Sequence, residues 1–132
     1  MIHLTAFDII ATHDETIKRY GGLSGAVDPL KADVLIERVR NHEHYQGLTD
    51  VFALAALYCV AIARGHIFLD GNKRTAINCT WDFLKLNGVQ TYAPRDLEET
   101  VIKVATGEMK ADAFADYLRM AFSSNEPRMR AK

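Results

Sequence analysis

A short segment in the middle of the chain, residues 66–75, brings together several groups that could do chemistry. It reads His-Ile-Phe-Leu-Asp-Gly-Asn-Lys-Arg-Thr, so an imidazole, a carboxylate, a carboxamide and two cations lie close together. An imidazole titrates near neutral pH and can serve as a general base. A carboxylate is the hard oxygen ligand that Mg²⁺ prefers beside phosphate groups. We therefore take His66 as a candidate base and Asp70 as a candidate metal ligand.

The second half of this segment has the composition of an anion-binding turn. Gly71 permits backbone angles that are closed to other residues, and the pattern predicts that a helix begins directly after it. The free N–H groups and the positive dipole end of such a helix form a ready anion site. Lys73 and Arg74 in the first turn would destabilise a bare helix, so we expect a nucleotide polyphosphate to bind there. Gly71 and Asn72 would contact it through the backbone and the carboxamide.

Each of these residues also has a purely structural interpretation. A loop histidine often only completes local packing, Asp-Gly-Asn is a common turn, and a Lys-Arg pair can simply be solvated. The combination of all of them between two apolar helices is what favours a functional site. We expect Ile67 and Phe68 to anchor the loop in the core. The segment is not a P-loop, because Gly-x4-Gly-Lys-Ser/Thr is absent, and it lacks the further acidic ligands of a calcium loop.

Two flanking residues are added to the candidate nucleotide-binding set. Asn78 lies one helical turn beyond Arg74 and can face the same site, although an exposed helix asparagine without a function would look similar. Arg64 precedes the loop and can reach phosphate, or it can pair with a carboxylate instead.

The elements that must position this segment are predicted to be helices. The chain has 132 residues, 48% of them apolar, which suits one domain with a core that needs no disulfide or metal. Caps, glycine stops and helical periodicity predict a compact all-α bundle of about six helices, with the phosphate-binding loop between the two most apolar ones. The expected helices cover residues 5–20, 28–42, 50–62, 72–87, 94–106 and 110–122. Residues 89–92 could be a short extended piece, and residues 123–132 are expected to form a flexible tail.

Composition excludes several other classes of protein. A net charge of −1 argues against a general nucleic-acid binder, and three cations in the tail do not make a basic face, so no direct DNA binding is expected. No apolar run approaches the roughly 20 residues of a membrane span, and no leader pattern is seen, which predicts a cytoplasmic protein. Cys59 and Cys79 lie in apolar stretches without a CxxC pair, so we expect buried thiols.

Residues 66–74 resemble the signature of the Fic/Doc family, His-x-Phe-x-(Asp/Glu)-Gly-Asn-Gly-Arg. The one departure is Lys73, where most Fic enzymes carry glycine. The similarity to the Doc (death-on-curing) toxin subfamily extends over nearly the whole chain, including the Tyr20-Gly21-Gly22 and Thr49-Asp50 steps. It implies a Fic/Doc catalytic domain over residues 1–122. It also implies that residues 44–49, a predicted loop or hairpin, are a flap that docks the target segment as an added strand.

The resemblance also implies an activity that uses ATP and Mg²⁺. In most Fic enzymes the histidine activates a target hydroxyl, which receives AMP. Doc-type members with lysine at the position of Lys73 are instead kinases, in which ATP binds in the reversed sense and offers its γ-phosphorus to a threonine of elongation factor Tu, arresting translation. By this resemblance His66 is the base, Asp70 holds Mg²⁺, and Lys73 and Arg74 neutralise charge on the transferred group.

Two alternative functions stay open on the same residues. Gly71 keeps the turn of the AMP transferases, so AMP transfer to a protein hydroxyl remains an alternative. A non-enzymatic helical binding module with a vestigial loop is the other, and the intact His66 and Asp70 speak against it.

The expected partner, besides the protein target, is an antitoxin. Many Fic enzymes carry an inhibitory helix with Ser/Thr-x3-Glu, but no glutamate here has serine or threonine four positions before it. The resemblance therefore implies a separate antitoxin whose disordered C-terminal segment folds on the toxin.

Overall fold

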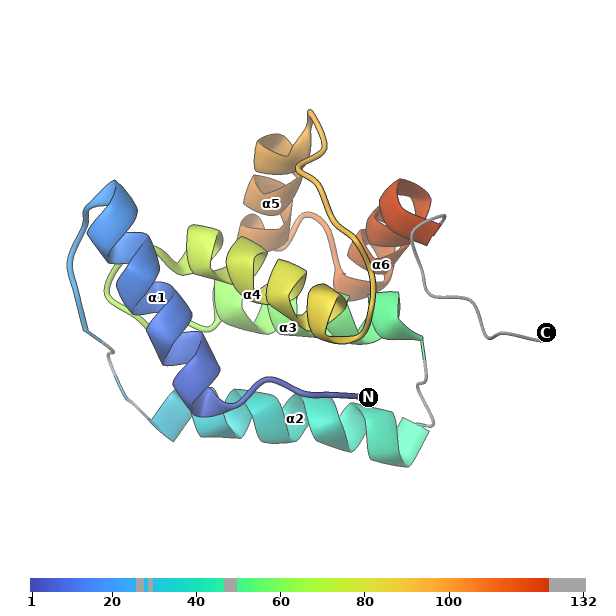
Figure 1. Ribbon diagram of the computed structural model, residues 1–132, viewed down its shortest axis with the longest axis horizontal. Helices are drawn as coiled ribbons and strands as arrows, with labels where there is room; N and C mark the ends of the chain where they lie inside the picture. Colours follow the sequence, from blue (N-terminus) through green and yellow to red (C-terminus); the bar gives the residue numbers. More distant parts are fainter. Residues whose placement is uncertain (26–27, 29, 47–49, 124–132) are drawn as a thin grey trace.

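The computed structural model describes residues 1–25, 28, 30–46 and 50–123, and this part of the chain is all-α, as the sequence predicts. The helices are α1 (Ala6–Tyr20), α2 (Leu30–Gln46), α3 (Val51–Arg64), α4 (Asn72–Leu86), α5 (Leu97–Thr106) and α6 (Ala111–Phe122) (Figure 1). None of the helices in the described part is long and apolar enough to cross a membrane.

Two predicted helix starts are confirmed by their capping bonds. At the start of α1, the Asp8 backbone N–H donates to Thr5 Oγ1 (3.1 Å) and the Thr5 N–H donates to Asp8 Oδ2 (2.8 Å), which makes a complete capping box. At the start of α3, the Phe52 N–H donates to Asp50 Oδ1 at 2.9 Å. These local bonds fix where α1 and α3 begin, and α3 leads directly to the candidate loop.

Helix α3 is the centre of the bundle. It packs against α2, α4, α5 and α6, and α1 and α2 lie on the opposite side of the α3–α4 pair from α5 and α6 (Figure 1). Buried side chains occur around most of its circumference, as its apolar sequence predicts; they include Phe52, Leu54, Tyr58, Cys59 and Ile62. A loop that leaves this helix therefore starts from the best-packed part of the molecule.

The end of α2 differs from the prediction. Residues 44–46 were expected in a loop, but the helix continues through Gln46. Glu43 lies near this end and accepts a bond from His3 Nε2 at 2.6 Å, and His3 Nδ1 lies 2.7 Å from the Tyr58 hydroxyl. This contact with the N-terminal segment supports the last turns of α2, and local periodicity does not reveal it. The rest of the predicted flap, residues 47–49, lies outside the described residues.

In the C-terminal part of the described chain, the start of α5 and residues 89–92 differ from the prediction, whereas the end of α6 agrees with it. Helix α5 begins at Leu97 rather than near residue 94, because Leu97 N–H first closes a turn onto the Pro94 carbonyl at 3.1 Å. Residues 89–92 belong to no helix or strand and form an irregular connection. Helix α6 ends at Phe122 as predicted, and the expected tail lies outside the described residues from 124 onward.

Both cysteines are buried and free, as the sequence predicts. Burial raises the pKa of each thiol, Cys59 and Cys79, to about 12. They therefore act as small core side chains and not as nucleophiles.

Candidate active site

Residues 65–71 connect α3 to α4 and present their polar groups outward. Ile67 and Phe68 are each only 2% exposed, while His66, Leu69 and Asp70 are exposed. The two buried side chains anchor the loop in the core, as expected. The His66 imidazole and the Asp70 carboxylate therefore lie at the surface, next to two side chains that are packed in the core.

Two residues of the loop adopt left-handed backbone angles. Gly71 has φ 77°, a conformation that favours glycine, and a Cβ at this position would lie 3.1 Å from Ile17 Cδ1, so a side chain there would also have to displace the end of Ile17 slightly. His66 has φ 51° and is the one non-glycine residue of the described chain with a positive φ. Such angles are uncommon for a residue with a side chain and are concentrated at functional sites. The fold therefore holds His66 in an orientation that a simple connection would not need.

Asn72 closes the loop onto itself. Its Oδ1 accepts from the Phe68 N–H at 3.2 Å, and its Nδ2 donates to the Phe68 carbonyl at 2.9 Å. The carboxamide that was assigned to phosphate is thus engaged with the loop backbone. Gly71, the N-cap of α4, has no side chain that could accept from the first turn, so within the described part of the chain the N–H groups of this turn are left without a cap and can face an anion. The carboxamide is therefore not free for the predicted contact with phosphate in this structure, which leaves the backbone N–H of Asn72 for that contact.

The Asp70 carboxylate is oriented from two sides. The Gly71 N–H donates to Oδ1 at 2.9 Å, and the Leu23 N–H, from the connection after α1, donates to Oδ2 at 3.3 Å. Gly22 backs closely onto it, because a Cβ there would lie 2.8 Å from Oδ2. A single oriented carboxylate beside a helix N-terminus suits Mg²⁺, which nucleotide sites hold with one or two carboxylates and the phosphates themselves. Among the described residues there is no group of three or more His, Cys, Asp or Glu side chains that could hold a metal ion by themselves.

The two cations of the first turn of α4 are exposed, and neither pairs with a carboxylate of the described chain. The Arg74 guanidinium carbon lies 4.0 Å from the centre of the Tyr20 ring, a cation–π contact that orients it. Beside them, a cavity of about 470 Å³ opens between α4 and α5; it is lined by Lys73, Arg74, Ile77, Ala93, Pro94, Arg95, Leu97, Glu98, Val101 and Ile102. The exposed cations and the cavity thus lie beside the helix N–H groups, an arrangement with the charge and space that a polyphosphate would need.

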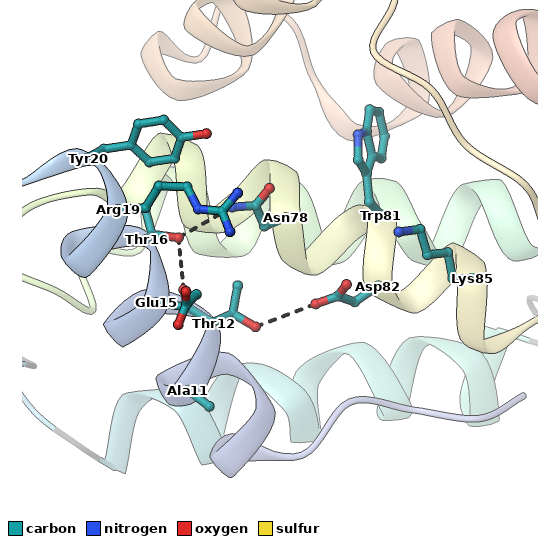
Figure 2. A pocket seen from close by; sticks show the side chains of 10 residues that line it. All are labelled: Ala11, Thr12, Glu15, Thr16, Arg19, Tyr20, Asn78, Trp81, Asp82 and Lys85. Carbon is teal, nitrogen blue, oxygen red and sulfur yellow. Dashed lines mark hydrogen bonds between the residues drawn. The ribbon is translucent and has the colours of Figure 1, made fainter.

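Arg64 and Asn78, the two flanking candidates, make contacts outside the loop. A Cβ placed on Gly107, which ends α5, would lie 3.1 Å from a guanidinium nitrogen of Arg64. The Arg64 guanidinium therefore lies at the C-terminal end of α5, where the helix dipole is negative. Asn78 Nδ2 donates to Thr16 Oγ1 of α1 at 3.3 Å. It faces a second cavity, of about 550 Å³ between α1 and α4 (Figure 2).

One face of α1 supports the loop around Asp70 and Gly71 and the start of α4, which the sequence did not reveal. His13, Ile17 and Tyr20 follow helical spacing on this face and contact, respectively, the Asp70 carbonyl, the region around Gly71, and Arg74. The spacing of the three is visible in the sequence. A face of that kind is normally assigned to general packing, and nothing local identifies the loop as its partner.

Comparison of the sequence with known proteins identifies the family to which the chain belongs. The sequence profile of the Fic/DOC family matches residues 3–84. The chain is 45% identical over 126 residues to the "Protein kinase doc" of Escherichia phage P1, covering 96% of this chain and 100% of that protein. It is 36% identical over 115 residues to "Toxin Doc" of Mycolicibacterium smegmatis (strain ATCC 700084 / mc(2)155), covering 85% of this chain and 82% of that protein. With this coverage and the loop of residues 66–74 at its centre, the chain belongs to the Fic/DOC family and resembles its Doc toxins over nearly its full length.

Proposed function

We propose that this protein is the toxin of a toxin–antitoxin module and a Doc-type protein kinase. It transfers the γ-phosphoryl group of ATP to a serine or threonine hydroxyl of a translation factor, elongation factor Tu by family resemblance. The observation that carries the proposal is the loop of residues 66–74, which carries an exposed imidazole, an oriented carboxylate and, in the first turn of α4, two exposed cations without a carboxylate partner in the described chain. The relative of 45% identity is named a protein kinase.

The proposed roles follow from the chemistry of each side chain and from the family resemblance. A ring nitrogen of His66 takes the proton of the target hydroxyl, whose oxygen forms a bond to the γ-phosphorus. The bond between that phosphorus and the bridging oxygen breaks, and ADP leaves. Lys73, Arg74 and the first N–H groups of α4 neutralise charge on the transferred and leaving groups. Asp70 would hold Mg²⁺, which supplies charge neutralisation and orientation of the phosphates.

Two alternative functions, AMP transfer and binding without catalysis, are distinguished by the experiment described below. Gly71 retains the left-handed turn of the AMP-transferring relatives, so AMP transfer uses the same loop. A binding module without activity would need none of these groups in place. Lys73 lines the α4–α5 cavity at the position where the family's AMP transferases carry glycine, and this favours phosphoryl transfer over AMP transfer. The intact His66 and Asp70 favour either enzyme over a binding module.

The deciding experiment uses ATP labelled at either the α or the γ position. The protein is incubated with bacterial extract, and His66→Ala serves as the matched control, since the loop is anchored by its neighbours Ile67 and Phe68. We expect the γ label, but not the α label, to appear on a protein of the size of elongation factor Tu. The transfer rate of His66→Ala should be roughly 10²–10⁴-fold lower than that of the wild type. Transfer of α-label would instead establish AMP transfer. Absence of any label with wild-type protein, or equal labelling by His66→Ala, would reject the catalytic assignment.

The antitoxin is tested separately in cells. Expression of this chain alone should arrest growth, and co-expression with a small protein encoded beside it should restore growth. That partner would have a C-terminal segment that folds on the toxin and gains its affinity by burying apolar surface. Normal growth with soluble wild-type protein accumulating alone would contradict the toxin assignment, whereas arrest by His66→Ala would separate toxicity from transfer.

A further inference from the structure

His13 is a fully buried histidine on α1, and it contacts the candidate loop in two ways. Its Nε2 lies 2.7 Å from the backbone carbonyl oxygen of Asp70, and its ring stacks on the Phe68 ring with the centroids 3.7 Å apart and the planes 4° from parallel. A carbonyl oxygen can only accept, so Nε2 must carry the proton and donate. One side chain therefore holds both the buried anchor of the loop and the backbone of its candidate metal ligand.

The other ring nitrogen shows that packing alone does not account for a histidine here. Nδ1 is buried and has no hydrogen-bond partner among the described residues. The nearest carboxylate oxygen, Asp14 Oδ1, lies 3.8 Å away and, when ionised, has no proton to give. An apolar ring would fill the same space without burying an unpaired nitrogen. The feature that a histidine adds is the bond from Nε2 to Asp70.

The bond from His13 to the Asp70 carbonyl also affects the direction of the Asp70 carboxylate. A Cβ on Gly71 would lie 3.7 Å from His13 Cδ2 and Nε2, so the imidazole lies directly against the left-handed turn. The carbonyl held by His13 belongs to the peptide unit whose N–H, on Gly71, donates to Asp70 Oδ1. Fixing this peptide plane therefore fixes the direction of that N–H and of the carboxylate bonded to it.

We propose that His13 is a positioning residue that sets the Asp70–Gly71 peptide, and through it the Asp70 carboxylate, against α1. This inference deepens the proposed kinase function and depends on it for its effect on catalysis. Groups that orient a metal ligand typically change metal affinity or activity by roughly 10- to 100-fold when they are removed. The same range is expected here, without any contact between His13 and substrate.

The test separates the hydrogen bond from the stacking. His13→Phe keeps an aromatic ring against Phe68 but has no donor, and His13→Gln has an amide that can reach the Asp70 carbonyl but no ring. His13→Met is made in parallel as a flexible apolar replacement, in case phenylalanine does not fit. The matched control is His3→Phe, a histidine bonded to Tyr58 and Glu43 elsewhere in the bundle. Each variant is measured by thermal denaturation, by hydrogen exchange of loop amides without ligand, and by steady-state kinetics at varied ATP and Mg²⁺.

We expect His13→Phe and His13→Met to fold, to exchange the amides of residues 66–72 faster, and to need more Mg²⁺ for half-maximal rate, with kcat lowered roughly 10- to 100-fold. His13→Gln should recover most of the loop protection and of kcat, and His3→Phe should change stability but neither loop exchange nor Mg²⁺ dependence. The proposal is overturned if His13→Phe has normal loop exchange and kinetics, or if folded His13→Gln is as defective as His13→Phe. If wild-type protein transfers no phosphate, the kinase proposal fails, while loop exchange still decides the role of His13.

Discussion

Replacement of Asn72 by alanine should loosen the loop, because the carboxamide makes two bonds to the Phe68 backbone, at 3.2 and 2.9 Å. Each such bond contributes about 1 kcal/mol net, and a buried N–H left without a partner costs about 1–3 kcal/mol. Phe68 is almost fully buried, so its N–H has little access to water. The change should therefore cost about 2–4 kcal/mol, most of it in local opening of the loop.

That cost translates into a measurable opening equilibrium. At about 1.4 kcal/mol for each factor of ten, the population of opened loop should rise roughly 30- to 700-fold. Because domains of this kind are stable by about 5–15 kcal/mol, the protein should stay folded. Hydrogen exchange of the Phe68 amide measures the local effect, and urea denaturation measures the global one. Phosphoryl transfer should fall through a lower kcat, since the loop spends less time in the closed geometry.

Asn72→Asp provides the sharper control. It keeps an oxygen that can accept from the Phe68 N–H but places a second oxygen against the Phe68 carbonyl, so one bond is kept and the other is lost. We expect loop protection between that of wild type and Asn72→Ala. Unchanged exchange of the Phe68 amide in Asn72→Ala, together with a raised KM for ATP, would refute this reasoning and return the carboxamide to direct phosphate binding.

Three further outcomes are expected. Lys73→Gly should open the phosphate site to the other orientation of ATP, so that the target gains the mass of AMP; a target that gains only phosphate, at an unchanged rate, would show that Lys73 does not select the donor phosphorus. Burial raises the pKa of Asp82, so its ionised form destabilises the fold at neutral pH. Asp82→Asn should therefore shift the urea midpoint upward at pH 7, and the gain should vanish below about pH 4, where the carboxyl is protonated in both folded and unfolded states; a gain that persists there would have another cause. Cys59 and Cys79, with pKa values raised to about 12, should resist a thiol reagent at pH 8 in the native protein and react in denaturant, and rapid native labelling would contradict their buried position.

Local signals in the sequence were sufficient to predict the helices and the place of the loop. The capping box of Thr5 and Asp8 and the cap at Asp50 involve residues two or three positions apart, and such bonds are encoded by neighbouring side chains. The apolar circumference of α3 predicted its central position. The polar loop between α3 and α4, with Ile67 and Phe68 as anchors, could be identified for the same reason.

The internal geometry of the site was decided by tertiary structure. The bond from His13 to Asp70 joins residues 57 positions apart, the bond from Asn78 to Thr16 joins residues 62 apart, and the cation–π contact of Arg74 depends on where α1 crosses α4. A sequence displays which groups a chain carries, but not which of them packing will engage. The composition of residues 66–74 thus led to the prediction of a phosphate-binding loop. Only the packed structure shows that the Asn72 carboxamide bonds to the loop backbone and that a face of α1 supports the loop.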